Sequence, residues 1–349
     1  MKSISAYQFA GAMIVVRILA LALYIPSEGE NPVVTALALP ILALAKYALL
    51  ALTIRAYEKQ TFTRGAAVCS AILAGALLIS ICGAFSQSVE TVYPDRFSRL
   101  GITAVFFIIG AYVASMGAAG TVRTAGIFLF AAAIFSAILL FQTRGSMLTD
   151  RITLYSPSPL RDLESALRNL TAYSADVFIF AMMLPYVRSS PKKAAGIYLT
   201  ADVLIWLVFA MAYAAIMGRL YPRSGYSFFA IAYCTQGLLI DRADGVFFCV
   251  VSAAAIIVCA LLTGILKNAV KYVFTSIRSD EKTYLAAAGV LTAAAISLSS
   301  FGIELSKYAG VLAAAVWIAL AVYALTGIFS RKYRAEKIRK TKRRVNDET

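Results

Sequence analysis

Residues 245–266, GVFFCVVSAAAIIVCALLTGIL, form an unbroken apolar run without a single charged side chain. At 1.5 Å of rise per residue, a helix of this length matches the roughly 30 Å hydrocarbon core of a bilayer. Similar runs recur along the whole chain. The sequence therefore predicts an α-helical membrane protein.

The overall composition supports the same fold class. Hydrophobic residues make up 60% of the 349 residues and charged residues 15%, and the mean hydropathy is +0.77. Soluble domains carry roughly 45–50% apolar and about 25% charged residues. We expect about ten spans in a single transmembrane domain, residues 1–330. The predicted spans are 8–26, 33–54, 65–86, 100–118, 122–141, 169–187, 194–217, 245–266, 283–300 and 306–329.

The first run contains Arg17 and is not followed by a small-residue cleavage site, so we expect a span there and not a cleaved signal peptide. The chain has no histidine, and its five cysteines show no metal-ligand spacing. We interpret the cysteines as small buried hydrophobes and predict neither a metal nor a cofactor. No Ser or Cys has a base placed for catalysis, so we do not expect an enzyme.

The basic residues predict the orientation. With the N-terminus inside, the inner segments hold 21 of the 33 Lys and Arg residues, and the outer segments hold 10. Cytoplasmic loops carry such an excess, so both termini are expected in the cytoplasm. Nine of the inner basic residues lie in the tail 331–349, which we interpret as a lipid-contacting anchor and not as a nucleic-acid site.

Four ionisable residues fall near the middle of predicted spans: Arg17, Lys46, Asp176 and Asp202. Each costs about 3 kcal/mol or more in the bilayer unless it is paired or hydrated. If the ten spans form two inverted repeats, 8–141 and 169–329, the two cations lie on spans one and two, and the two anions lie on spans six and seven. We therefore predict the pairs Arg17–Asp176 and Lys46–Asp202. The alternative is that each charge snorkels or bonds locally.

The start of span six is polar and built from small residues. The stretch Thr171-Ala-Tyr-Ser-Ala-Asp176 precedes an apolar run that ends at Pro185. Such residues at depth predict an interrupted helix, whose free backbone groups bind the charged ends of a small zwitterion. Tyr112, Tyr173 and Tyr233 are candidates to line a cavity, although a membrane tyrosine is often an interface anchor.

Two outer connections are long. The first, 142–168, includes an amphipathic piece from Leu160 to Leu167 that we expect on the protein surface or at the membrane interface. The second, 218–244, contains an apolar stretch from Phe228 to Ile240 that is too short to span. It is either a lid folded over the outer face or a simple surface helix.

Four stretches resemble the B subunits of nutrient germinant receptors (spore permeases), within the amino acid–polyamine–organocation superfamily. They are Ile4–Gln8 leading to Tyr24-Ile-Pro26, Ala111–Gly117 with Val122-Arg123, Ser174–Asp176 through Leu184-Pro-Tyr186, and Ile240–Asp244. The chain departs from that family at Arg17–Ala20, where a small-residue break is usual, and at Asp176, where a Glu is common.

The resemblance implies a LeuT-like fold of 5+5 spans with helices one and six interrupted and the ligand between them. It implies an amino acid or similar nutrient as ligand, A- and C-type subunits as partners, and the spore inner membrane as location. The expected function is a germinant-sensing subunit, and the alternative is a proton- or sodium-coupled permease. The candidate ligand-binding residues are Arg17, Ala20, Tyr112, Tyr173, Ser174, Ala175 and Asp176.

Overall fold

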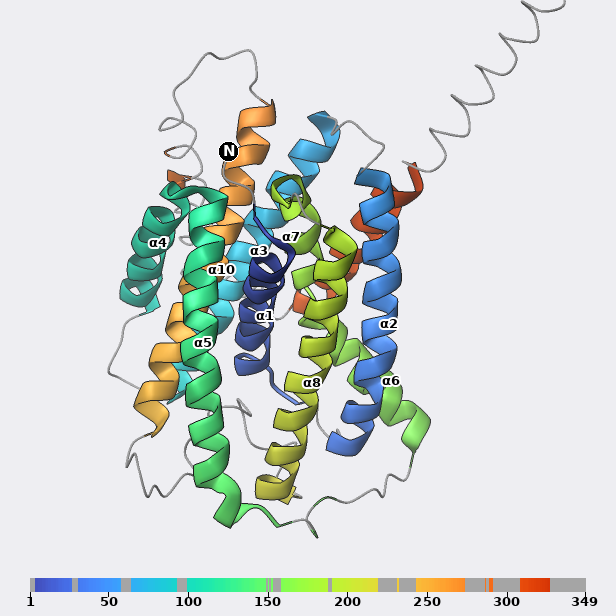
Figure 1. Cartoon of the computed structure of the whole chain (residues 1–349), viewed down its shortest axis with the longest axis vertical. Helices are drawn as coiled ribbons and strands as arrows, with labels where there is room; N and C mark the ends of the chain where they lie inside the picture. Colours follow the sequence, from blue (N-terminus) through green and yellow to red (C-terminus); the bar gives the residue numbers. More distant parts are fainter. Residues whose placement is uncertain are drawn as a thin grey trace, which may run out of the picture.

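The computed structural model is almost entirely helical in the part of the chain that it describes. Its only β-type pairing among those residues is an isolated bridge between Ile4 and Val187. Figure 1 shows the helices gathered into one bundle with most axes running along its length. The described residues are 4–26, 31–57, 64–92, 99–148, 150, 152, 158–187, 190–218, 231, 243–273, 286, 289–290 and 308–326.

The labelled elements have the following bounds: α1 Ala6–Ala22, α2 Pro32–Tyr57, α3 Arg64–Val92, α4 Arg99–Ser115, α5 Gly117–Thr143, η1 Arg144–Ser146, α6 Pro159–Ala172, α7 Asp176–Met183, η3 Leu184–Tyr186, α8 Pro191–Met217 and α10 Ala243–Val273. A further helix covers Ala309–Thr326.

Six helices in the described residues are long and apolar enough to cross a bilayer, and they range from 18 to 30 residues. Two shorter apolar helices, Ala6–Ala22 and Asp176–Tyr186, lie among them. The protein is therefore an all-α, multi-pass membrane protein. The count of ten spans stays a prediction, because most of 283–300 lies outside the described residues, as do most of 218–244 and all of the tail 331–349.

Local sequence explains where several helices begin. The Ser5 hydroxyl accepts from the Gln8 amide while the Gln8 side chain accepts from the Ser5 amide, which is a capping box for α1. Pro191 starts α8, where its missing N–H is harmless, and the Ser190 side chain accepts from the Lys193 amide. Gly117 has φ +80° between α4 and α5, a conformation that strains any residue with a Cβ.

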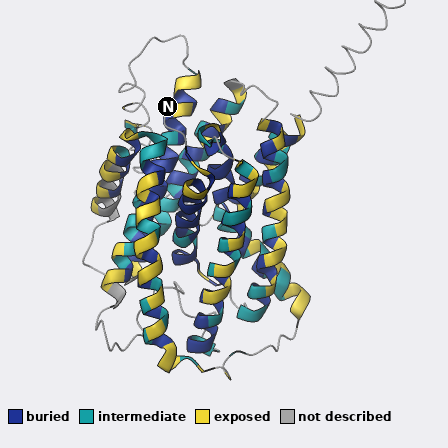
Figure 2. Cartoon of the chain, in the orientation of Figure 1, coloured by how far each residue is buried: buried dark blue, intermediate teal, exposed yellow. Residues whose placement is uncertain are grey.

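Helices α1 and α7 lie in the centre of the bundle. Most residues of both are buried, and Figure 2 shows them dark blue between partly exposed outer helices. Helix α1 packs against α5, α8, α10 and α7. Helix α5 instead exposes large apolar side chains such as Ile127 and Phe130, as expected of a surface that faces lipid.

The sixth predicted span is interrupted, and the first is not. Helix α6 ends at Ala172 and α7 begins at Asp176, so Tyr173–Ala175 form a break at the polar stretch identified from the sequence. Helix α1 is continuous from Ala6 to Ala22. The interruption of helix one was therefore a wrong prediction, because its apolar residues include no helix breaker; the chain leaves the helix only at Leu23–Pro26.

The start of the sixth span is also corrected. Residues 169–172 belong to the amphipathic helix α6, which begins at Pro159 and leaves Leu160 82% exposed. This helix lies against α2 and at an angle to the bundle in Figure 1. The amphipathic piece 160–167 is thus continuous with the first turn of the predicted span.

Contacts identify two ends of the bundle. Helices α1 and α8 begin at the upper end of the bundle in Figure 1. Next to the start of α1, Ile4 N–H donates to the Tyr186 carbonyl, and the Lys193 ammonium in the first turn of α8 lies over the Tyr7 ring. At the lower end, Nδ2 of the Asn169 side chain donates to the Ile25 carbonyl, and Leu148 N–H donates to the Ala215 carbonyl.

Candidate functional site

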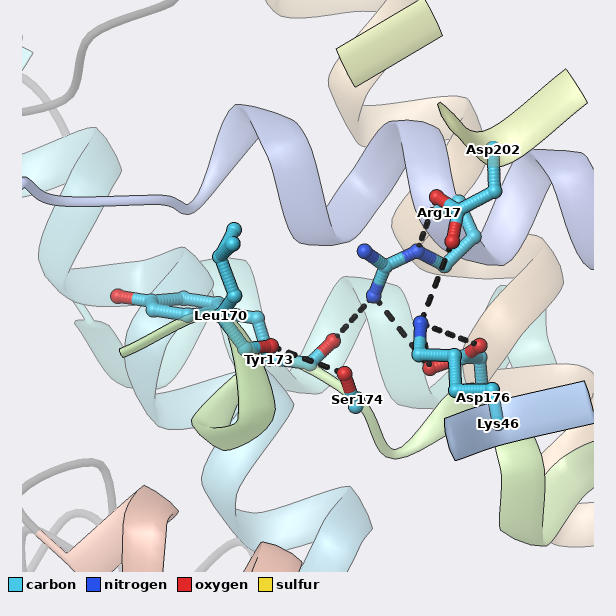
Figure 3. Close-up of polar contacts among 7 residues, drawn as sticks. All are labelled: Arg17, Lys46, Leu170, Tyr173, Ser174, Asp176 and Asp202. Carbon is cyan, nitrogen blue, oxygen red and sulfur yellow. Dashed lines mark hydrogen bonds and ion pairs between the residues drawn. The ribbon is translucent and has the colours of Figure 1, made fainter. Parts of the chain in front are cut away.

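Four helices each contribute one charged side chain to a single buried cluster. Arg17 comes from α1, Lys46 from α2, Asp176 from the first position of α7, and Asp202 from α8. All four residues are at most 5% exposed. Figure 3 shows their charged groups converging beside the break between α6 and α7. We call these four residues the charge cluster.

Every cation in the charge cluster contacts both carboxylates. Arg17 Nε lies 2.6 Å from Asp202 Oδ1, and Arg17 Nη1 lies 3.4 Å from Asp176 Oδ1. Lys46 Nζ lies 3.1 Å from Asp176 Oδ2 and 3.2 Å from Asp202 Oδ2. The four formal charges sum to zero, and four ion pairs tie α1, α2, α7 and α8 together.

The two pairs expected from the sequence are both present, and the structure adds two more. Arg17–Asp176 and Lys46–Asp202 are contacts at 3.4 and 3.2 Å. The shortest contact of each cation is the other one, Arg17–Asp202 and Lys46–Asp176. The repeat pattern predicts two separate pairs, because it does not show that the first pair of helices lies within reach of the second.

Burial makes this cluster sensitive to single changes. Removing two charges from water costs several kcal/mol per ion, and mutual attraction offsets that cost only with good geometry. Removing one partner leaves an uncompensated charge, which destabilises proteins by about 3–5 kcal/mol. We therefore expect a change of any single member of the charge cluster to destabilise the protein strongly.

The break supplies a further ligand for the arginine. Because helix α6 ends at Ala172, the Tyr173 carbonyl has no place in a helical ladder, and it accepts a hydrogen bond from Arg17 Nη1 at 2.6 Å. Ser174 is fully buried and its hydroxyl donates to the Leu170 carbonyl at 2.9 Å. The backbone freed by the break is thus held partly by α1 and partly by the last turn of α6.

One hydrogen-bond donor of the charge cluster has no acceptor among the described residues. Arg17 Nη2 is buried and has no hydrogen-bond partner among the described residues. In Figure 3 this nitrogen points away from both carboxylates. An unmet buried donor costs about 1–3 kcal/mol, more for a charged group.

One aromatic residue that the sequence did not point to, Trp206, lies against the arginine. The Trp206 ring lies 4.9 Å from the Arg17 guanidinium carbon, an attractive cation–π distance. Tyr24 packs edge-on against both Trp206 and Tyr173, with ring centroids 5.0 and 5.2 Å away. The signal was available, since Trp206 follows Asp202 by four residues and so shares its helix face.

A cavity of about 240 Å³ lies beside the break, between α1, α3 and the helix Ala309–Thr326. We call it the break cavity. Its wall is mainly apolar, and its polar side chains are Ser80, Gln87, Tyr173 and Asp176. Because Asp176 also belongs to the charge cluster, the cavity and the cluster share one carboxylate. The remaining lining residues are Val16, Leu19, Ala20, Leu23, Ile25, Leu77, Ile81, Ala84, Ala172, Ala175, Val258, Ala309, Leu312 and Ala313.

The predicted ligand-binding residues divide into three groups. Ala20, Tyr173, Ala175 and Asp176 line the break cavity. Arg17 and Ser174 lie next to it, in the charge cluster and in the break.

The prediction that Tyr112 lines the ligand cavity is wrong. Tyr112 lies on α4 with 66% of its surface exposed and does not line the break cavity. The alternative for Tyr112, an anchor at the membrane interface, stays a prediction. Tyr233 lies outside the described residues.

A second cavity, of about 550 Å³, lies at the upper end of the bundle. We call it the tyrosine cavity, because Tyr57, Tyr186, Tyr272 and Tyr323 line it. It reaches α7 at Ala181 and Met182, whereas the break cavity reaches α7 at Asp176. Residues 177–180 between these contacts are buried, so α7 separates the two cavities.

Cysteines do not form a metal site in the described part of the chain, where no cluster of three His, Cys, Asp or Glu side chains could hold an ion. Cys82 on α3 and Cys259 on α10 are buried with their sulfur atoms 3.6 Å apart. Both behave as packing residues between two closely packed helices.

Neither the protein-family models nor the curated proteins compared with this chain gave a match.

Proposed function

We propose that the protein is a membrane-embedded receptor subunit that binds an amino acid or similar small nutrient in the break cavity and passes a conformational change to partner subunits. Its resemblance to B subunits of germinant receptors suggests A- and C-type partners, the spore inner membrane and a LeuT-like fold of ten spans. One observation carries the proposal: Asp176 lines the break cavity and also bonds Lys46 and Arg17.

Size and polarity of the cavity support a small ligand with an apolar part. The volume, about 240 Å³, lies below the roughly 300–1,000 Å³ of pockets for drug-sized molecules. Its apolar wall accommodates a side chain, while Tyr173 and Asp176 offer polar contacts at one edge. Arg17, which bonds both Tyr173 and Asp176 without lining the cavity itself, keeps one buried donor, Nη2, without a partner among the described residues.

The same residues explain how ligand binding would change the contacts between helices. A ligand shifts a conformational equilibrium only when it binds the two states with different affinity. A ligand group that competes for the Asp176 carboxylate weakens the contacts to Lys46 on α2 and Arg17 on α1. The break lets α7 move with respect to α6, since no helical ladder crosses Tyr173–Ala175.

A secondary permease is the second candidate, and the tyrosine cavity favours it. Two cavities at the two ends of one buried helix segment are compatible with alternating access around a central site. In this function one carboxylate of the charge cluster would carry the coupling proton. Both functions need ligand binding in the break cavity, and they differ in whether the ligand crosses.

The experiment that tests the proposal combines binding and uptake. We expect one or more amino acids to raise the unfolding temperature of the purified full chain, because a ligand that binds only the folded state stabilises it by mass action. The same compound is then offered to proteoliposomes under proton and sodium gradients. Stabilisation without uptake supports the receptor, and gradient-driven uptake supports the permease.

Two matched variants locate the binding site. Ala20→Leu fills the break cavity without changing charge, and we expect it to abolish the ligand-induced stabilisation. Tyr112→Ala removes a large exposed side chain away from the cavity and should leave that stabilisation unchanged. Equal ligand responses in both variants would place the ligand elsewhere and reject the break cavity.

A further inference from the structure

Two cysteines from distant parts of the chain meet inside the bundle. Cys82 lies on α3 and Cys259 lies on α10, 177 residues later, and their Sγ atoms are 3.6 Å apart. Both residues are buried, at 7% and 4% exposure. They belong neither to the charge cluster nor to the lining of the break cavity, so the proposed function gives the two thiols no chemical role.

The separation of the two sulfur atoms is close to what a disulfide bond requires. A disulfide has an S–S length of about 2.0 Å, so the two Sγ atoms would have to approach by about 1.5 Å. Rotation about the Cα–Cβ bonds moves a sulfur atom over such a distance while the helix backbone stays in place. Because α3 and α10 pack against each other, the two side chains remain within reach.

The surroundings of the pair determine which oxidant can reach it. Helix α4 covers Cys259 so closely that a Cβ atom at Gly110 would lie 3.3 Å from the Cys259 Cβ. Such dense packing excludes bulky or charged oxidants, whereas hydrogen peroxide is small and uncharged. The other two described cysteines, Cys69 and Cys249, lie on the same two helices but are exposed.

From these observations we infer that Cys82 and Cys259 form an oxidative modification site, which a peroxide converts into a disulfide between α3 and α10. In the first step one sulfur attacks a peroxide oxygen, the O–O bond breaks, and a sulfenic acid and a water molecule form. In the second step the other sulfur displaces the sulfenic oxygen as water, and the S–S bond forms. The sulfurs lose two electrons, the peroxide gains them, and both thiol protons leave in the two water molecules. Burial slows the first step, and the short distance between the sulfurs favours the second.

The disulfide would act on the break cavity through the cavity wall. Ile81 and Val258, which precede the two cysteines in the sequence, line that cavity from α3 and α10. A covalent bond between these helices fixes the distance between the two parts of the wall, so a state in which that distance differs is no longer accessible. This consequence rests on the proposed function, whereas the formation of the disulfide does not.

The test treats the purified full chain with hydrogen peroxide and blocks the remaining thiols before proteolytic digestion. Mass spectrometry identifies the linked peptides, and dithiothreitol is added to reverse the link. The variant Cys82→Ser removes one partner of the pair. The matched control is the double variant Cys69→Ser/Cys249→Ser, which changes the same two helices at exposed positions and keeps the pair.

We expect a cross-link between Cys82 and Cys259 in the unchanged chain and in the control, and its loss in Cys82→Ser. The cross-link should raise the unfolding temperature by roughly 5 °C, because it closes a long loop in the unfolded chain. If Cys82→Ser does not fold, the cross-linked peptide of the unchanged chain decides. Peroxide treatment that gives no such cross-link, or one that joins Cys69 or Cys249 instead, overturns the inference.

The ligand response separates this inference from the proposed function. In the peroxide-treated chain we expect the ligand-induced stabilisation to fall, and dithiothreitol to restore it. An unchanged ligand response in a fully cross-linked chain overturns the effect of the disulfide on the break cavity. A cross-link without any ligand response before or after oxidation supports the modification site and counts against the proposed function alone.

Discussion

The first and sixth predicted spans each carry a buried charge, but one helix is continuous and the other is broken. Helix α1 is continuous and carries a buried cation, Arg17, whereas the sixth span is broken directly before a buried anion, Asp176. The break frees the Tyr173 carbonyl, and Arg17 takes it as a ligand. An interruption in one helix can therefore supply a hydrogen-bond acceptor to a charge on an unbroken neighbour.

The largest expected effect comes from breaking the charge cluster. Asp176→Asn leaves Lys46 and Arg17 short of a carboxylate, and we expect a loss of about 3–5 kcal/mol in stability. The double variant Asp176→Asn/Lys46→Gln should recover much of that loss, because the 2.6 Å Arg17–Asp202 contact remains. The measurement is thermal unfolding of the purified variants.

A comparison double variant tests the geometry of the cluster. Asp176→Asn/Arg17→Gln should recover less, because it removes the shortest contact in the cluster and leaves Asp202 with Lys46 alone. If both double variants are as unstable as the sums of their single changes, the four residues are not energetically coupled.

The next effect separates the continuous helix from the broken one. Ile18→Pro in α1 should cost about 3 kcal/mol or more, because proline removes a hydrogen bond inside the helix and clashes with the preceding turn. Ala175→Pro should cost much less, since Ala175 caps α7 with φ −65°, the angle that proline prefers.

The control for this pair is Ile18→Ala, which removes the side chain without the proline ring. The change in unfolding temperature caused by Ile18→Ala is subtracted from that caused by Ile18→Pro, and the difference is then compared with the change caused by Ala175→Pro. Equal losses for Ile18→Pro and Ala175→Pro would mean that the sixth span is as continuous as the first.

The smallest effect concerns the contact between the break and the end of α1. The Tyr173 hydroxyl accepts from the Ile25 amide at 3.4 Å, a long hydrogen bond. Tyr173→Phe should therefore lower stability by about 1 kcal/mol or less. Tyr112→Phe, on an exposed position of α4, should change it by less than about 0.5 kcal/mol, and differential scanning fluorimetry resolves the order of the two.

Much of the fold class follows from local properties of the chain. Apolar runs of span length predict membrane helices, because the backbone must satisfy its own hydrogen bonds in lipid, and six such helices are present. The stretch 171–176 predicts the break, since Thr171, Ser174 and Asp176 are polar and have low helix propensity. The rule that buried charges need partners predicted ion pairs among the four intramembrane residues.

Local sequence thus shows which residues need burial and pairing, because that need follows from the free-energy cost of placing each group in lipid. The packing of the helices determines that Arg17 and Lys46 share both carboxylates, that Trp206 covers the guanidinium, and that Tyr112 faces outward. These outcomes depend on how helices far apart in the chain are rotated and packed. No local pattern encodes that rotation, because several packings bury the same residues equally well.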